Sequence, residues 1–370
     1  MGRPVVITGG GTGGHVFPMQ AIAESLRERG LGASELRYVG SRRGQERTLL
    51  VGDVALTLLP GRGLRRSWGV SDVVANVGAV IGLVGALIIA QWLVRRWRPS
   101  VVVSVGGYAS FAVALAAVSW RVPLVLVDFD AAPGASHRLL GRFATARCMA
   151  FASSGDNVVV TGAPLRAAIE SLDRSTSARG EAKARLTPPI DVERSVVVVM
   201  TGSLGSHRVN AAVRELARAW SSRSDRALVH VTGRRDYEEF ATTKPLVESL
   251  DYRVIDFGDM VELWSLCDVA VCRAGAITVA ELTTLAVPAV LVPLPGAPND
   301  HQTKNARVLA DAGGAIVLSD AQCTGEALAN ALEIMMAPPT LEEMGRAVHA
   351  LAHPHAADAI ADVVLESRAS

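Results

Sequence analysis

The sequence predicts an α/β protein made of two similar halves, each a doubly wound, Rossmann-like parallel sheet. Short apolar runs recur along the chain, and each is followed by a glycine-rich or polar turn and then by a helical pattern. This succession begins at residues 5–8 and begins again at residues 196–200. A chain of 370 residues, of which 49% are hydrophobic and 20% charged, is long enough to bury two cores.

The first turn holds glycine at nearly every position from 9 to 14 and ends in His15. Because glycine has no side chain, such a turn lets backbone amides crowd around a diphosphate at the start of the next helix, which we expect at about 18–29. His15 suits a general base or a diphosphate donor, and it also suits an ordinary position at a helix start. The further residues expected at the ligand are Thr12, Gly13 and Gly14.

The same turn formally matches the G-x-G-x-x-G pattern of dinucleotide sites, which is a weak signal on its own. A dinucleotide site would place an acidic residue at the end of the second strand. The strand expected at 36–39 is followed instead by Gly40-Ser41-Arg42-Arg43, and two arginines suit a 2′-phosphate. An NADP-dependent oxidoreductase therefore stays open as an alternative.

A second glycine turn follows the strand expected at 101–105 and supplies Gly106, Gly107 and Tyr108 as further ligand contacts. The next strand, at 123–127, leads to two carboxylates, Asp128 and Asp130, at the same edge of the sheet. Asp130 is our second candidate for a catalytic base, after His15. The alternative is that both aspartates cap the helix expected to begin near residue 133.

Residues 73–94 form the most apolar segment of the chain and lead into Arg95-Arg96-Trp97-Arg98. The segment has the length of a membrane span. A single crossing, however, would leave the strands at 5–8 and 101–105, which should pair, on opposite sides of the bilayer. We therefore expect one or two helices whose exposed apolar face and basic end lie on an anionic membrane surface. A buried helix pair and a true span are the alternatives.

The second half is organised around a βαβ unit between residues 268 and 306, with a turn at Gly275 and Ala276 between the first strand and its helix. Glu281 lies on that helix, where a carboxylate suits two hydrogen bonds from vicinal hydroxyls such as those of a ribose. The residues that suit the reading of sugar hydroxyls are Asn299, His301, Gln302 and Asn305. A plain core unit with a polar surface loop is the alternative.

The composition excludes several classes of function. A net charge of +1 gives no electrostatic case for nucleic acid. The four cysteines have no metal spacing, and Met1 leads directly into a core strand, so we expect no signal peptide and a reducing, cytoplasmic environment. Residues 174–194, rich in Ser, Arg, Pro and Gly, are interpreted as a linker. The last helix, within residues 356–370, is amphipathic and is expected to pack back on the first domain.

Seven motifs follow one another along nearly the whole chain. They are GGGTGGHVFP (9–18), GGYAS (106–110), TGAPLR (161–166), TGSLGS (201–206), GDM (258–260), CRAGAITVAEL (272–282) and DHQTKNA (300–306). In this order they resemble the motifs of the MurG family, the bacterial UDP-GlcNAc:lipid I N-acetylglucosaminyltransferases of glycosyltransferase family 28. The resemblance implies an inverting enzyme with the two-domain GT-B fold.

The resemblance also implies roles for single residues. It places the acceptor and the membrane on a domain of residues 1–163, whose glycine turns hold the acceptor diphosphate, and the UDP-sugar on a domain of residues 164–345. It implies no metal and no cofactor, because backbone amides and a helix N-terminus stabilise the leaving UDP. The implied donor contacts are Glu281 with the ribose, Ser203 with a phosphate, Phe257 on the uracil, Gln302 and His301 with the GlcNAc hydroxyls, and Arg166 beside the nucleotide.

The chain departs from the family at two places on the acceptor side. Val127-Asp128-Phe129-Asp130 stands where the family typically has His-Glu-Gln-Asn, and Ala163 replaces the usual asparagine before proline.

Taken with the resemblance, the sequence predicts transfer of GlcNAc from UDP-GlcNAc to a polyprenyl-diphosphate-linked acceptor at the cytoplasmic face of the membrane, as in the step from lipid I to lipid II. A different lipid-phosphate or specialised-metabolite acceptor, and a catalytically silent binding protein, are the alternatives.

Overall fold

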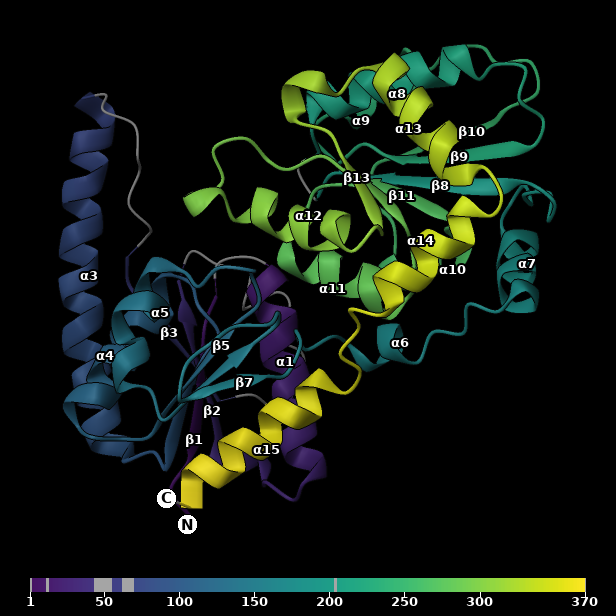
Figure 1. The fold of residues 1–370 in the computed structure, drawn as a ribbon. Helices are drawn as coiled ribbons and strands as arrows, with labels where there is room; N and C mark the ends of the chain where they lie inside the picture. The colour runs from purple at the N-terminus through teal and green to yellow at the C-terminus, as the bar shows by residue number, and fades with distance from the viewer. Residues whose placement is uncertain (1, 11–12, 43–54, 62–69, 203–204, 370) are drawn as a thin grey trace. The chain divides into compact units, whose positions relative to one another are not determined.

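The computed structural model describes residues 2–10, 13–42, 55–61, 70–202 and 205–369. The contacts between Cα atoms divide the chain into two compact units, Met1–Arg166 with His353–Ser370, and Ala167–Ala352. Each unit holds one parallel sheet with helices on both of its faces (Figure 1). The α/β class and the doubly wound architecture predicted from the sequence are confirmed.

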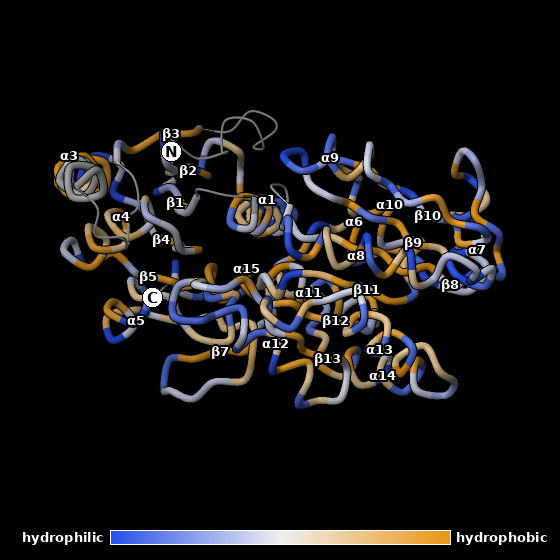
Figure 2. Tube along the Cα trace, turned by 90° about the horizontal axis from the view of Figure 1, so that it is seen from above, coloured by the Kyte–Doolittle hydropathy of each residue, from blue (hydrophilic) through white to orange (hydrophobic). Residues whose placement is uncertain are grey.

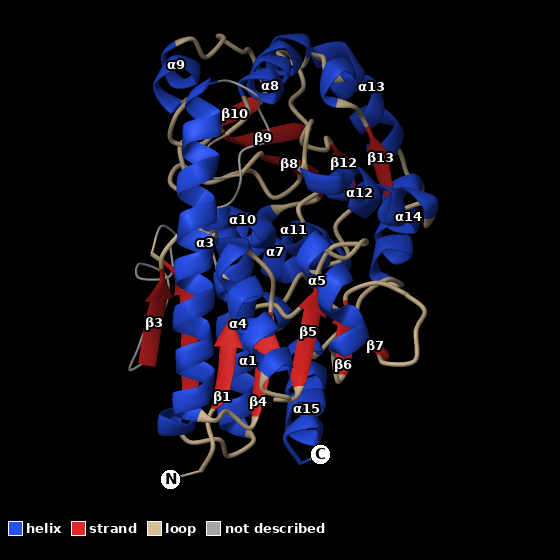
Figure 3. Cartoon of the chain, turned by 90° about the vertical axis from the view of Figure 1, so that its left-hand side faces the viewer, coloured by secondary structure: helices blue, strands red, loops and turns tan. Residues whose placement is uncertain are grey.

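The first unit is built on a seven-stranded sheet in the order β3-β2-β1-β4-β5-β6-β7, with every pair parallel. The strand order reverses between β1 and β4, and the arrows of β1, β4 and β5 point the same way in Figure 3. The turns after these strands therefore lie at one edge of the sheet, at the switch point where open α/β sheets bind ligands. The strands are β1 (Val5–Thr8), β2 (Leu36–Ser41), β3 (Ala55–Leu59), β4 (Val101–Ser104), β5 (Leu124–Asp128), β6 (Ala146–Met149) and β7 (Val158–Val160).

Helices α3, α4 and α5 cover one face of this sheet, and α1 and α15 cover the other (Figure 1). The C-terminal helix α15 is tied to α1 by charge pairs: Arg29 contacts Asp358 at 2.7 Å and Asp362 at 2.5 Å. The helices are α1 (Gly13–Glu28), α3 (Val70–Trp97), α4 (Tyr108–Ser119), α5 (Ala135–Leu140) and α15 (Ala356–Ala369).

The apolar segment forms one continuous helix, α3, which Figure 2 shows end-on at the margin of the first unit. Ala86, Ala90 and Leu93 of this helix are buried in the core that α3 shares with α4. By length and composition alone, Gly78–Trp97 is sufficient to cross a membrane, although 28% of its apolar window is buried inside the protein. The buried helix pair considered from the sequence is therefore wrong, because a single helix uses only one of its sides for packing.

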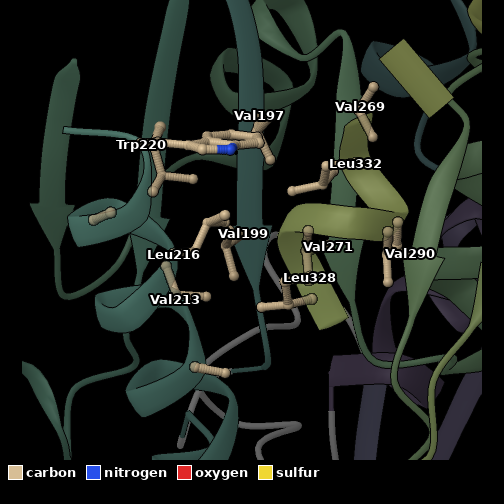
Figure 4. Packing of buried hydrophobic residues seen from close by; sticks show 14 of the residues in the cluster. Val197, Val199, Val213, Leu216, Trp220, Val269, Val271, Val290, Leu328 and Leu332 are labelled. Carbon is tan, nitrogen blue, oxygen red and sulfur yellow. The ribbon is translucent and has the colours of Figure 1, made fainter. Parts of the chain in front are cut away.

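The second unit holds a six-stranded parallel sheet in the order β10-β9-β8-β11-β12-β13, with its own switch point between β8 and β11. Figure 4 shows the core on one face of this sheet, where Val197 and Val199 of β8 meet Leu216, Trp220 and Leu328. The strands are β8 (Ser195–Met200), β9 (Arg226–Val231), β10 (Asp251–Ile255), β11 (Val269–Cys272), β12 (Ala289–Leu291) and β13 (Ala315–Val317). The helices are α6 (Ala167–Glu170), α7 (Thr176–Arg185), α8 (His207–Ala219), α9 (Tyr237–Thr242), α10 (Met260–Leu266), α11 (Ala276–Thr284), α12 (His301–Asp311), α13 (Gly325–Met336) and α14 (Thr340–His349).

The interpretation of residues 174–194 as a linker is wrong. The segment contains α7, which packs on α10, and two of its cations approach Asp268: Arg179 Nη1 at 2.5 Å and Lys183 Nζ at 3.7 Å. The charged residues that gave the segment its linker-like composition are therefore partners of an acid at the start of β11. The chain passes from the first unit to the second at Arg166 and Ala167.

Candidate functional site

The two glycine turns of the first unit lie against each other at its switch point. Gly107 has φ +89°, and a Cβ atom there would lie 2.4 Å from the carbonyl oxygen of Gly10. A Cβ atom at Gly9 would lie 2.2 Å from a methyl carbon of Val105. Only glycine permits both the positive φ and this approach. The predicted convergence of the turns is therefore confirmed, while their role as a diphosphate cradle stays a prediction.

His15 lies in the first turn of α1 and faces the second glycine turn. Its Nε2 atom lies 3.5 Å from the position that a Cβ atom would take at Gly106, and its ring centroid lies 6.4 Å from that of Phe129. Asp130, the next residue, is partly exposed, as is His15. Both candidate bases thus lie at the carboxyl edge of the first sheet. Thr12 lies outside the described residues.

A buried chain of hydrogen bonds joins Ser104, His137 and Asp128 at the same edge. Ser104 Oγ lies 2.8 Å from His137 Nε2, and His137 Nδ1 lies 2.8 Å from Asp128 Oδ1. Ser104 is fully buried, which excludes it as a nucleophile despite the resemblance of this arrangement to a hydrolase triad. The N-cap of α5 is Gly134, so neither Asp128 nor Asp130 occupies the N-cap position, and Asp128 pairs instead with the His137 side chain.

His137 was not predicted from the sequence, because its hydrogen-bond partners are set by the packing of α5 and not by any local pattern. A signal existed in part: Ser104 and Asp128 end two neighbouring parallel strands, so their side chains had to lie at one edge. Among the described residues, Asp128 Oδ2 is buried without a hydrogen-bond partner. Asp128 also faces Cys148, whose thiol pKa burial raises to about 12.

The remaining candidates of the first unit, Tyr108 and Arg166, pack against protein groups. A Cβ atom at Gly61 would lie 2.1 Å from the Tyr108 hydroxyl, and one at Gly82 of α3 would lie 3.8 Å from it. Within the described chain that hydroxyl has no hydrogen-bond partner, and burial raises its pKa. The Arg166 guanidinium lies 5.0 Å from the ring centroid of Phe17 on α1. A direct ligand contact by either residue stays a prediction.

In the second unit, Glu281, the carboxylate predicted to bind the ribose, lies buried on α11, the helix of the βαβ unit. Gly275 is the N-cap of α11 and Ala276 is its first residue, so the backbone of both lies at the helix start. Glu281 is 7% exposed and accepts a hydrogen bond from the indole nitrogen of Trp264 at 3.0 Å. Because burial of a carboxylate is costly without such a donor, the indole stabilises its charged form. Trp264 was also missed by the sequence analysis.

The helix α12 and the loop before it carry the predicted sugar-reading residues. His301 and Gln302 begin the helix and are partly exposed, and Gln302 Oε1 accepts from the backbone N–H of Leu294 at 2.9 Å. Asn299 has φ 55°, an uncommon left-handed conformation for a residue other than glycine. Asn305 is fully buried and donates to the carbonyl of Ala274 at 3.1 Å. Its expected part in reading a sugar is therefore wrong, because it holds the turn between β11 and α11.

Phe257 follows β10 and is 55% exposed, and the guanidinium of Arg234 lies 5.0 Å from its ring centroid. A half-open aromatic face beside an arginine suits the stacking of a base. Ser203 lies outside the described residues. The loop that carries it ends at Ser206, whose Oγ accepts from Arg273 Nη2 at 2.7 Å. Arg273 also contacts Asp320 at 2.8 Å, so it joins the loops after β8 and β13.

A second buried polar network lies under the loop after β8. The amide of Asn210 donates to the carbonyl of Thr232 at 2.9 Å, and its oxygen lies 3.0 Å from His230 Nε2. His230 Nδ1 lies 3.0 Å from the Tyr252 hydroxyl. Burial lowers the pKa of His230 to about 3, so the ring is neutral at physiological pH. The Asn210 oxygen only accepts, so the His230 proton is on Nε2 and the Tyr252 hydroxyl donates to Nδ1.

The four cysteines are not placed for thiol chemistry. All four cysteines are free and buried, and burial raises the pKa of Cys267 to about 12 and that of Cys323 to about 11. Thiols of this kind are unreactive. In the part of the chain that the structure describes, no group of three or more His, Cys, Asp or Glu side chains could hold a metal ion.

Two Rossmann-like sheets, each with polar side chains gathered at its switch point, define the two-domain architecture of the GT-B fold. The model of the glycosyltransferase family 28 N-terminal domain matches residues 5–149, and that of the C-terminal domain matches residues 196–360. The chain belongs to glycosyltransferase family 28. The oxidoreductase considered from the first glycine turn is thereby excluded.

Several relatives are similar over nearly their whole length. The chain is 36% identical to a UDP-N-acetylglucosamine:N-acetylmuramyl-(pentapeptide) pyrophosphoryl-undecaprenol N-acetylglucosamine transferase of Anaeromyxobacter dehalogenans strain 2CP-1, covering 98% of this chain and 92% of that one. It is 34% identical to the enzyme of the same name from Desulforudis audaxviator, covering 97% of both chains. Among solved structures, MurG of Acinetobacter baumannii has a TM-score of 0.78 and 27% identity, over 99% of this chain and all of that one.

Proposed function

We propose that this chain transfers N-acetylglucosamine from UDP-N-acetylglucosamine to a lipid-linked diphosphate acceptor, with inversion at the sugar C1. The observation that carries the proposal is the similarity of the chain to named transferases across both units, 36% identity over 98% of its length. Similarity confined to one unit would support only a nucleotide-binding or an acceptor-binding module. An acceptor of lipid I type, yielding lipid II, is the form of the reaction that the names of these relatives support.

The donor is assigned to the second unit. Glu281 accepts hydrogen bonds from the ribose hydroxyls, and the exposed ring of Phe257 lies on the uracil. His301 and Gln302 contact the hydroxyls of the sugar. The backbone amides at Gly275 and Ala276, where α11 begins, stabilise the negative charge of the departing UDP without a metal. Ser203 completes this assignment as the phosphate contact, and Arg166, the last residue before the second unit, keeps the nucleotide contact predicted from the sequence.

The acceptor is assigned to the first unit, where Gly13, Gly14, Gly106 and Gly107 hold its diphosphate. A base takes the proton of the acceptor hydroxyl, the oxygen bonds to the sugar C1, and the bond from C1 to the UDP oxygen breaks. His15 and Asp130 are the candidate bases, both at the edge described above. If Asp130 is the base, His15 binds the diphosphate as a donor.

The first unit also carries the surface that we assign to the membrane. Ile81, Val84, Ile88 and Trp92 of α3 follow a spacing of three or four residues and are each more than half exposed. They form a continuous stripe on the side of α3 that faces away from α4, and Arg95 and Arg96 follow in its last turn. An apolar stripe that ends in cations suits peripheral binding to an anionic leaflet, on the cytoplasmic side where UDP-sugars are made.

One observation favours a second candidate, the same transfer to a different lipid phosphate. The segment Val127–Asp130, which lacks the family's usual His-Glu-Gln-Asn, supplies Asp128 to a buried network and Phe129 to the surroundings of His15. Val127 is buried and apolar. The acceptor side is thus built from different groups, and a lipid I assay beside a panel of other polyprenyl phosphates decides between the two candidates.

The donor assignment is tested by calorimetry of UDP binding to Glu281→Ala. Loss of a charged acceptor of hydrogen bonds costs about 1.5 to 3 kcal/mol per bond, so we expect UDP and UDP-GlcNAc to bind at least about tenfold more weakly. Glu326→Ala, which removes an exposed glutamate of α13, is the matched control and leaves both affinities unchanged. Wild-type affinity in folded Glu281→Ala would refute the ribose assignment.

A further inference from the structure

We infer that Trp264 is a positioning residue that makes Glu281 selective for a ribose, an inference that rests on the donor assignment proposed above. Trp264 itself is fully buried, so its side chain is not accessible to a ligand. Its effect on the nucleotide passes through one hydrogen bond, from its indole nitrogen to Glu281 Oε2 at 3.0 Å.

The hydrogen bond between Trp264 and Glu281 can run in only one direction. An indole N–H only donates, and an ionised carboxylate only accepts, so the bond favours the charged form of Glu281 and fixes the direction in which Oε2 points. A glutamate side chain has three rotatable bonds, and each hydrogen bond to its carboxylate reduces the rotamers that it samples. With one oxygen held by the indole, the plane of the carboxylate is set before a nucleotide arrives, and less conformational entropy is lost on binding.

The helix that carries the indole, α10, is held at both of its ends. Asp259, the N-cap of α10, accepts from the backbone N–H of Val261 at 2.7 Å and so defines where the helix begins. The guanidinium of Arg174 donates to the backbone carbonyls of Trp264 and, at 2.6 Å, of Cys267. Arg174 is half-buried, and burial lowers its pKa. Both ends of α10 are therefore fixed, and with them the backbone of Trp264.

The residues just before α10 also carry the side chain that we assign to the uracil. Phe257 lies two positions before Asp259, and Gly258 between them packs on Leu263, since a Cβ atom there would lie 2.9 Å from a Leu263 methyl carbon. The ring for the uracil and the donor that orients the ribose carboxylate thus belong to one rigid stretch, 257–264. The distance between base and ribose contacts is fixed by α10 as well as by α11.

The test compares UDP with 2′-deoxy-UDP, which lacks one of the two hydroxyls that Glu281 receives. We expect the wild type to bind UDP about tenfold or more tightly than 2′-deoxy-UDP. Trp264→Phe keeps most of the ring volume and removes the N–H. In this variant we expect the UDP to 2′-deoxy-UDP ratio to fall to about threefold or less, mainly through weaker binding of UDP. Trp220→Phe, which removes a buried indole from the core of the same unit, is the matched control and leaves the ratio unchanged.

A merely structural role of Trp264 would weaken both nucleotides alike and leave the ratio at its wild-type value, and that result would overturn the inference. If Glu281→Ala also leaves the ratio at its wild-type value, the ribose assignment itself is wrong, so the two failures are distinguishable. Should Trp264→Phe not fold, β-(3-benzothienyl)alanine introduced at position 264 replaces only the N–H by sulfur, and the same fall in the ratio is expected.

Discussion

Acid should destabilise the second unit through one buried histidine, His230. The folded unit holds this ring neutral, because burial lowers its pKa to about 3, whereas in an unfolded chain a histidine has a pKa of about 6.5. Between these two pH values the ring of His230 is protonated in the unfolded chain and neutral in the folded unit. The free energy of unfolding therefore falls as the pH falls below about 6.5, and the loss ends near pH 3.

The size of the effect follows from the same two pKa values. Each pH unit in this window costs about 1.4 kcal/mol, so the change from pH 7 to pH 5 removes about 2 kcal/mol of stability. The groups that face His230 do not titrate between pH 7 and pH 5: burial raises the pKa of Tyr252 to about 12, and the guanidinium of Arg235 lowers the pKa of Asp236, which reaches His230 through Asn210. Within this network, His230 is therefore the main source of the predicted fall in the free energy of unfolding as the pH is lowered.

The measurement is native-state hydrogen exchange of the amides of β9 and β10, which reports the stability of the second unit by itself. His230→Gln keeps an N–H donor toward Asn210 and has no proton to gain in this range. At pH 7 the variant should be less stable by about 1 to 3 kcal/mol, because the Tyr252 hydroxyl loses its acceptor. The wild type should then lose about 2 kcal/mol more than the variant on acidification to pH 5. Parallel curves for the two proteins would refute the argument that the ring is held neutral.

Two further predictions concern the first unit. Asp130→Asn keeps the shape of the side chain and removes its ability to take a proton. If Asp130 is the catalytic base, turnover should fall by about a hundredfold or more with UDP affinity intact, whereas near-normal turnover would return the role to His15. Asp156→Asn, at an exposed surface position, is the control. The protein should sediment with vesicles that contain anionic lipid and be partly released by salt, because salt screens the charge contribution and not the apolar one. Ile88→Asp should weaken this binding, while Ile334→Asp, at a similarly exposed isoleucine of the second unit, should not; equal binding by all three proteins would contradict the membrane assignment of α3.

Much of the fold was predictable because its signals are local. The apolar runs at β1 and β8 are short and fully buried, and the glycine turns after β1 and β4 need conformations that only glycine adopts readily. Positions set by tertiary contacts were not predictable in this way. Trp264 lies 17 residues before Glu281, and nothing in either local pattern indicates that they meet.

The linker error has the same origin. Arg179 and Lys183 gave a stretch of polar composition, and only their contacts with Asp268, far along the chain, show that they belong inside the second unit. Composition reports which residues are polar, whereas the fold decides which of them find partners. Glu281, by contrast, was assigned to the helix of the βαβ unit from the local pattern alone, and it lies on α11, while its contact with a ribose stays a prediction.

Both units place a buried polar network against a glycine loop at the switch point, and one physical reason accounts for both. A glycine loop that leaves room for a ligand has no side chains with which to pack, and its backbone loses more entropy on ordering than any other. Hydrogen bonds from the layer behind it offset that loss. In the second unit Asn210 and His230 fix the Thr232 carbonyl, which a Cβ atom at Gly205 would approach to 1.9 Å. In the first unit His137, held between Ser104 and Asp128, lies 4.0 Å from the Cβ position of Gly106. At the described glycines Gly106 and Gly205, the backbone thus packs on buried groups that we do not assign to the phosphate, and substitutions in either network should weaken ligand binding without removing an assigned ligand contact.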